Sequence, residues 1–276
     1  MDELAERDAT GDVAVIYDEI RRFWAVPYVS SMQRHLATRP GWLEWVWAAL
    51  RPAFASGLAQ TAAWRAAEGL AVPRLAPITR DALAVWSVDE AGERAIRATC
   101  DSFIHASPTN LVLSGLLRRL LAGERPSGSG GIGVDRPWTP PPPVPSLPAM
   151  VDLAAVSPAE RDVLLSLSTP VDGQPFVPGL YRMLRQWPGF VAHVATVLKP
   201  HVQDPETRAS CRQLLDAVDA EIPAVFAALP PLPQHPPMPP QTEFPGVLAA
   251  LDAYRKTSPE MVIFSRLIRD ALPTPG

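Results

Sequence analysis

Apolar residues recur at spacings of three and four along most of the chain. Residues 12–24, "DVAVIYDEIRRFW", place Val13, Ile16, Ile20 and Phe23 on one helical stripe. No run of strand length alternates apolar and polar residues. The pattern predicts an all-α protein.

Capping signals place the ends of several predicted helices. Ser-Pro pairs, typical of an N-cap followed by the first helical position, predict helix starts at Ser107, Ser157 and Ser258. Ser87, followed by acidic residues, predicts another start. The helical stretch 41–71 should be kinked or broken at Pro52.

Part of the sequence occurs twice. "PYVSSMQRHLATRPGW" (27–42) aligns without a gap to "PFVPGLYRMLRQWPGF" (175–190) at an offset of 148 positions. Downstream, Asp101 and the residues of 107–121 match Asp252 and those of 258–272 at an offset of 151. Two copies are too few for a solenoid. We expect two fused helical repeats that pack as a pseudo-dimer about an approximate twofold axis, with a ligand in the cleft between the repeats.

Proline-rich stretches punctuate this organisation. Residues 124–148 begin Gly/Ser-rich and continue as polyproline, which is typical of a linker without regular structure. The predicted division is therefore a first repeat at 1–123, a linker at 124–148 and a second repeat at 149–276. A second proline cluster at 229–246 has no counterpart in the first repeat.

Composition and residue spacing argue against several kinds of partner and cofactor. A net charge of −4 without a basic stripe argues against nucleic-acid binding, and no apolar run approaches the ~20 residues of a membrane span. The acidic start lacks the features of a signal peptide, and only two cysteines occur, so we expect a reducing, cytoplasmic location. Cys100 falls on an apolar stripe and is expected in the core. The histidines show no ligand spacing and no phosphate loop is present, so no metal and no cofactor are expected.

Several stretches resemble the group I 2-haloacid dehalogenases. They are "IYDEIRRFWAVPYV", "ATRPGWL", "SFIHASPTNLVLSGLL" and "YRMLRQWPGF", spread over most of the chain in the same order. The resemblance implies an all-α fold of two fused repeats around a central pocket. It also implies hydrolysis, in which a carboxylate activates the water that displaces halide from the carbon beside a carboxylate.

The residues that carry this chemistry in the family are mostly replaced. Counting back seven positions from Trp187, the family's Asp becomes Leu180, which cannot accept a proton, and the Ser before it becomes Gly179. Asp172, in a Gly/Pro-rich loop, is either a turn residue or a relocated base. The residues at the family's pocket positions, and thus the substrate-binding candidates, are Tyr28, Ser31, Ser107, Gly179, Leu180 and Tyr254. We expect Tyr28 and Ser31 to share one face of a helix start.

These departures leave three functions open. The first is displacement or elimination of a leaving group without the family's water-activating Asp, such as an intramolecular ring closure in secondary metabolism. The second is a non-catalytic small-molecule-binding or accessory protein that stabilises a partner enzyme. The third is a hydrolytic dehalogenase that uses Asp172. The expected ligand is a small molecule in each case, and both a homodimer and a complex with another protein stay open.

Overall fold

A computed structural model describes residues 2–126, 128, 138–144, 146–171 and 173–274. The elements of the first 123 residues are η1 (Glu6–Asp8), α1 (Gly11–Trp24), α2 (Ser31–Leu36), α3 (Trp42–Ala55), α4 (Leu58–Glu68), α5 (Arg80–Val85) and α6 (Glu90–Leu121). Those that follow are η2 (Leu153–Ala155), α7 (Pro158–Leu165), β1 (Thr169–Val171), β2 (Gln174–Phe176), α8 (Gly179–Leu184), α9 (Pro188–Val202), α10 (Pro205–Ala228), η3 (Gln241–Glu243) and α11 (Phe244–Ala271). In the described ranges, strands occur only in the antiparallel β1–β2 hairpin. The all-α prediction is confirmed.

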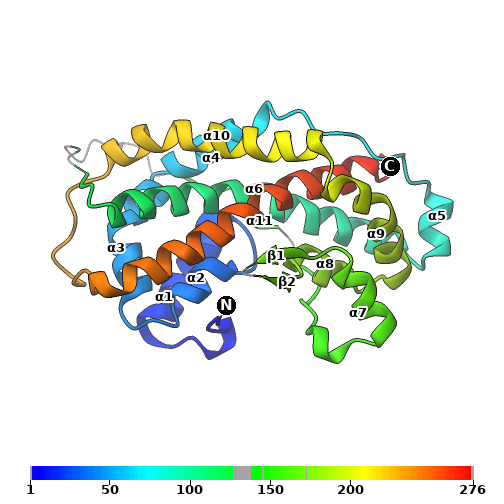
Figure 1. Ribbon diagram of the computed structural model, residues 1–276, viewed down its shortest axis with the longest axis horizontal. Coiled ribbons are helices and arrows are strands. Elements are labelled where there is room, and N and C mark those ends of the chain that lie inside the picture. The colour runs from blue at the N-terminus through cyan, green and yellow to red at the C-terminus, as the bar shows by residue number, and fades with distance from the viewer. Residues whose placement is uncertain (1, 127, 129–137, 145, 172, 275–276) are drawn as a thin grey trace. The chain divides into compact units, whose positions relative to one another are not determined.

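The chain forms two compact units. Unit 1 comprises residues 1–69, 108–143 and 214–258, and unit 2 comprises 70–107, 144–213 and 259–276. Each unit therefore contains segments from both predicted repeats. Helices α6, α10 and α11, the long helices in Figure 1, each contribute residues to both units.

In unit 1, α3 packs against α1, α2 and α4, which lie together in the blue part of Figure 1. The contact is rich in aromatic residues. Trp24 stacks on Phe54 with ring centroids 4.6 Å apart, and Trp42 and Trp45 are fully buried. Aromatic pairs of this kind add to the stabilisation that burial provides, so α3 is the central helix of this unit.

Unit 2 repeats this arrangement. Helix α9 packs against α7 and α8, and its Phe190 is fully buried. The amide of Leu4 donates to the carbonyl of Arg34 in unit 1, and 147–148 positions later the amide of Val151 donates to that of Arg182 in unit 2. The element order thus fits the internal repeat, whose twofold packing stays a prediction.

Two ion pairs follow the same relation. Arg118 pairs with Asp252 inside unit 1, and Arg269 pairs with Asp101 inside unit 2. The two arginines are 151 positions apart, as are the two aspartates. Each pair joins one predicted repeat to the other with the roles exchanged, which is the pattern of contacts expected at an isologous interface.

Two predicted helix starts are wrong. Helix α6 continues through Ser107 and Pro108, and α11 continues through Ser258 and Pro259. A proline inside a helix costs about 3 kcal/mol. On both sides of each proline, however, the helix buries apolar side chains, including Cys100 and Leu111 in α6. Burial across several turns outweighs the local break signal.

Three other boundary predictions have mixed outcomes. Ser157 caps α7 in a capping box with Glu160, as expected. Ser87 does not cap α6, since Asp89 accepts the Gly92 amide at 2.7 Å instead. Helix α3 passes Pro52 and ends at Ala55, close to Gly57, which has a φ of +75°. The described residues of 124–148 form neither helix nor strand.

Candidate functional site

A buried polar cluster lies inside unit 1, centred on Asn110 of α6. Asn110 is the only asparagine in the sequence and is 1% exposed. Its carbonyl oxygen Oδ1 accepts two hydrogen bonds, from Trp24 Nε1 at 2.8 Å and from Gln33 Nε2 at 2.7 Å. Because an indole N–H can only donate, Trp24 fixes which end of the Asn110 amide is the oxygen. The amide nitrogen of Asn110 must point the other way.

The amide nitrogen of Asn110 lies on the side of Tyr254, a residue of α11. Asn110 Nδ2 donates to Ser30 Oγ at 2.6 Å. Side-chain hydrogen bonds also join Tyr254 to Ser258, Ser30 and Asn110. Burial raises the pKa of Tyr254, against the opposing effect of these hydrogen bonds. The phenol therefore keeps its proton at neutral pH.

The direction of these hydrogen bonds decides what Tyr254 can do. The Asn110 amide nitrogen can only donate, and the Ser30 oxygen already accepts from it, so the Ser30 hydroxyl proton is available to Tyr254. Asn110 and Ser30 can thus both donate to the phenolic oxygen, and the phenol's own proton can go to Ser258 Oγ or to a bound molecule. Tyr254 is half-buried, so part of its side chain is accessible. Chained hydrogen bonds polarise one another, which strengthens Tyr254 as a donor.

The cluster draws on both predicted repeats. Ser30 and Asn110 belong to the first repeat, and Tyr254 and Ser258 to the second. Of the predicted substrate-binding residues, Tyr254 is a member, and Tyr28 and Ser31 flank Ser30 in the chain. The expected helix face of Tyr28 and Ser31 is wrong: Ser31 is the first residue of α2, and Tyr28 precedes the helix. Both side chains are half-buried.

The other predicted residues lie in unit 2. Ser107 is buried in the middle of α6. Gly179 and Leu180 begin α8. A Cβ on Gly179 would lie 2.8 Å from Met150 Cε, so Met150 occupies the place of a larger side chain. Leu180 is fully buried in the core. Asp172 lies outside the described residues.

A carboxyl group that the sequence reasoning missed lies elsewhere in unit 2. Glu260 of α11 accepts a hydrogen bond from Thr169 of β1 at 2.7 Å. Burial raises the pKa of Glu260, although the Thr169 hydrogen bond opposes the shift. Glu260 is close enough to raise the pKa of the buried Tyr181. An acid that follows a Ser-Pro pair gave no sequence signal, because such acids commonly occupy exposed first turns.

Neither cysteine has the character of a nucleophile. Cys100 is fully buried, which confirms the core prediction, and burial raises the pKa of its thiol. Burial likewise raises the pKa of Cys211 to about 12. Reactive thiols have a lowered pKa. Among the described residues no group of three His, Cys, Asp or Glu side chains could hold a metal ion, and no helix there is long and apolar enough to cross a membrane.

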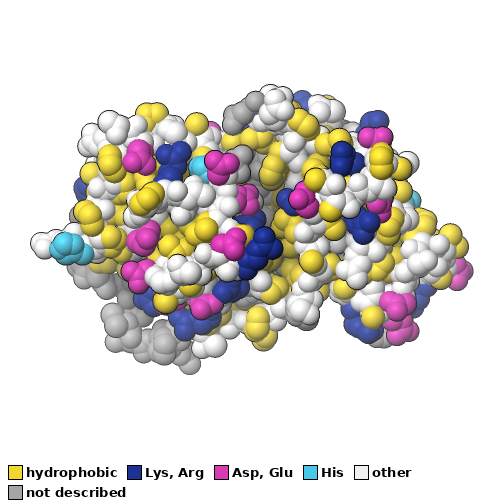
Figure 2. Space-filling view, turned by 90° about the horizontal axis from the view of Figure 1, so that it is seen from below, with side chains coloured by type: hydrophobic (Ala, Val, Ile, Leu, Met, Phe, Trp, Pro, Cys, Tyr) yellow, Lys and Arg dark blue, Asp and Glu magenta, His cyan; other side chains and the backbone are white. Residues whose placement is uncertain are grey.

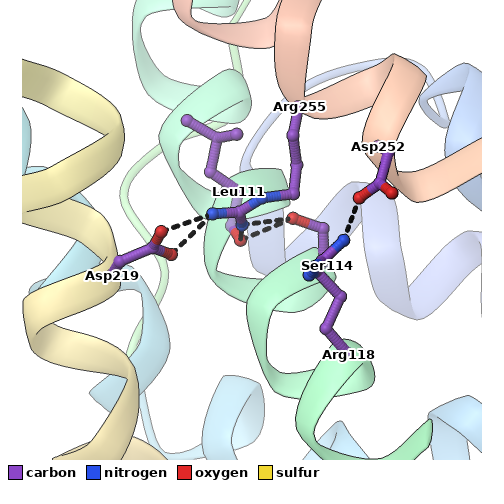
Figure 3. A network of polar contacts seen from close by, with 6 residues as sticks. All are labelled: Leu111, Ser114, Arg118, Asp219, Asp252 and Arg255. Atoms are coloured by element: carbon purple, nitrogen blue, oxygen red, sulfur yellow. Dashed lines mark hydrogen bonds and ion pairs between the residues drawn. The ribbon is translucent and has the colours of Figure 1, made fainter. Parts of the chain in front are cut away.

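A charged network in unit 1 holds α11 in place (Figure 3). Arg255 donates to both carboxylate oxygens of Asp219 of α10, at 2.6 and 2.7 Å, and to Ser114 Oγ of α6 at 3.1 Å. Arg118 and Asp252 pair nearby. Because Arg255 follows Tyr254 in the helix, this network fixes the helix that carries the phenol. Elsewhere, charges of both signs are interspersed over the face in Figure 2.

Comparison with known proteins identifies structures of similar fold. No protein-family model and no curated protein matches the chain. Solved structures of D-2-haloacid dehalogenase do match: a mutant in complex with D-2-CPA has a TM-score of 0.75 and 17% identity, over 98% of this chain and 95% of that chain. A complex with L-LA has a TM-score of 0.76 and 17% identity, over 98% and 96%. The chain therefore has a haloacid-dehalogenase-like fold.

Proposed function

We propose that the protein binds a small organic molecule beside Tyr254 and promotes departure of a leaving group from it, without a water-activating Asp. The observation that carries the proposal is the arrangement of donors around the Tyr254 oxygen. Because Tyr254 keeps its own proton, it can donate a hydrogen bond to a group that becomes negatively charged. Donors placed where charge develops are a large source of catalysis.

The reaction that fits is an intramolecular ring closure. An amine nitrogen of the substrate uses its lone pair to form a bond to the carbon that bears chlorine. The carbon–chlorine bond breaks, chloride leaves with the electron pair, and the new ammonium releases one proton to solvent. Tyr254 donates to the departing chloride. Such a reaction needs orientation more than a base, so it is compatible with leucine at position 180.

Hydrolysis is less well supported. Loss of a general base typically costs about 10²–10⁴ in rate. The residue at the family's base position, Leu180, is fully buried and apolar. A hydrolytic enzyme would need another base, for which Asp172 is the sequence candidate.

A second candidate function is non-catalytic binding, alone or as an accessory subunit of a partner enzyme. The buried Leu180 and the two unreactive cysteines favour it, because they remove the groups that would most directly attack or activate. In that case Tyr254 would contribute to affinity alone.

The test is chloride release from 5-chloropentylamine at pH 9, where closure yields piperidine and hydrogen chloride. We expect the protein to accelerate release over buffer. A hydrogen bond to a charged group is worth about 1.5–3 kcal/mol, so Tyr254→Phe should slow the catalysed reaction roughly tenfold to hundredfold. No acceleration would refute catalysis of this reaction. Binding of the amine without acceleration would favour the second candidate.

A further inference from the structure

The side chain of Gln33 has an unusual environment. Gln33 is fully buried in unit 1, and its amide nitrogen donates to Asn110. Its carbonyl oxygen Oε1 is buried and has no hydrogen-bond partner among the described residues. Buried polar groups in folded proteins nearly always have a partner. The Gln33 oxygen is therefore an acceptor whose hydrogen-bonding capacity is unused by the described residues.

Exchanging the oxygen and nitrogen of the Gln33 amide would not give Oε1 a suitable partner. Asn110 Oδ1 is identified as an oxygen by the Trp24 indole, which can only donate. Gln33 must therefore present its nitrogen to Asn110, since an oxygen in that place would face another oxygen. The position of Oε1 is a consequence of the Trp24–Asn110–Gln33 arrangement.

The surroundings also restrict the charge of a ligand. The side chains that form this cluster are uncharged at neutral pH: Trp24, Ser30, Gln33, Asn110, Tyr254 and Ser258. A carboxylate taken into this cluster would lose its hydration without gaining a cation from it. A carboxylate would also be repelled by the Gln33 oxygen.

We propose that the ligand bears an N–H group that donates to Gln33 Oε1, so that its class is carboxamides and uncharged amines rather than carboxylates. The inference rests on the proposed function, because it places the ligand at the same cluster. Tyr254 then donates to an acceptor or leaving group at one end of the ligand, and Gln33 accepts at the other.

Unit 1 supplies a matched control. Gln60 is also fully buried, and its Oε1 also has no partner among the described residues. Its nitrogen, however, donates to the backbone carbonyls of Phe23 and Phe54, at 3.2 and 3.0 Å. Gln60 is thus similar in burial and chemistry but does not take part in the Asn110 hydrogen bonds.

Three probes of similar size distinguish the effect of an N–H group from the effect of charge. They are 2-chloropropionamide, which is neutral and has N–H groups, methyl 2-chloropropionate, which is neutral without N–H, and 2-chloropropionate, which is negatively charged. Dissociation constants would be measured by NMR titration of the full chain at pH 7. We expect the carboxamide to bind at least fivefold more tightly than either other probe. Failure of the carboxamide to bind, or an ester or carboxylate that binds as tightly, would overturn the proposal without any variant.

Two variants then test whether the preference for the carboxamide depends on Gln33. Gln33→Met should abolish the preference for the carboxamide, and Gln60→Met should retain it. A preference unchanged in Gln33→Met would overturn the role of Gln33. The outcome is independent of turnover: a retained preference together with no chloride release from 5-chloropentylamine would refute the proposed catalysis and leave the ligand class standing.

Discussion

Replacing Asn110 with leucine tests whether the polar cluster is a single connected structure. Leucine has nearly the same size and shape but neither accepts nor donates a hydrogen bond. The variant would deprive the Trp24 and Gln33 nitrogens of their acceptor and Ser30 of its donor. Both nitrogens belong to buried residues, so neither finds water as a replacement without rearrangement.

The expected loss of stability follows from these contacts. A buried donor left without a partner costs about 1–3 kcal/mol, so two such donors cost about 2–6 kcal/mol, partly offset by the greater hydrophobicity of leucine. We expect a net loss of about 2–4 kcal/mol. For a chain of this size each kcal/mol lowers Tm by about 2–4 °C, which gives a decrease of about 4–16 °C.

Urea denaturation followed by circular dichroism would measure this loss, with Thr99→Val as the control. Thr99 is a fully buried polar residue of the same helix, and its hydroxyl donates to the carbonyl of Ala95 in its own helix. We expect Thr99→Val to lose less than about 1 kcal/mol. An Asn110→Leu variant as stable as Thr99→Val would show that the hydrogen bonds around Asn110 contribute little to stability. The inference that Tyr254 acts as a hydrogen-bond donor would then lose its basis.

Other predictions concern the rest of the chain. Arg255→Met should lose about 2 kcal/mol by urea denaturation, because the arginine makes charge-assisted hydrogen bonds from a buried position, whereas Arg118→Met, at an exposed ion pair, should lose less than about 1 kcal/mol; equal losses would contradict this. The raised pKa of Glu260 means that the folded protein binds the proton more tightly than the unfolded chain, so this stabilisation is lost as pH rises through the titration of the group. The Tm of Glu260→Gln minus that of the wild type should therefore increase from pH 4 to pH 7. A difference in Tm that stays constant over this range would refute the pKa shift. Neither enantiomer of 2-chloropropionate should release measurable chloride, and rates typical of a haloacid dehalogenase would restore the hydrolytic hypothesis. Limited proteolysis should cut first near residues 127–131, a region whose cleavage sites lie largely outside the described residues, and a protected segment there would contradict the linker prediction.

The all-α fold was predictable because its signal is local and repeated. Apolar spacings of three and four persist through α1, and its Ile16, Ile20 and Phe23 are buried as expected. Helix ends were less predictable, since they depend on burial far along the helix. The pair Ser157–Pro158 begins a helix and Ser107–Pro108 does not, although the two dipeptides are identical. The difference is the apolar surface that α6 buries on both sides of its proline.

The candidate site was predictable only in part. Tyr254 was found through resemblance to a family, but its partners were not. Asn110 is joined to Trp24 across 86 positions and to Gln33 across 77 positions, and such pairings leave no periodic pattern in a single sequence. One usable signal existed: the only asparagine of the chain stands in a largely apolar helical stretch, "TNLVLSGLL". Asparagine is unfavourable inside helices, so its presence there indicates a specific hydrogen-bonding role.

The most direct test of the central proposal, a ligand held by Tyr254 without a water-activating carboxylate, is a crystal structure of the protein with 2-chloropropionamide. We predict the ligand within hydrogen-bond distance of the Tyr254 hydroxyl and of Gln33 Oε1, with no Asp or Glu oxygen within reach of the carbon that bears chlorine. A ligand bound away from Tyr254, or an Asp172 or Glu260 carboxylate aimed at that carbon, would contradict the proposal.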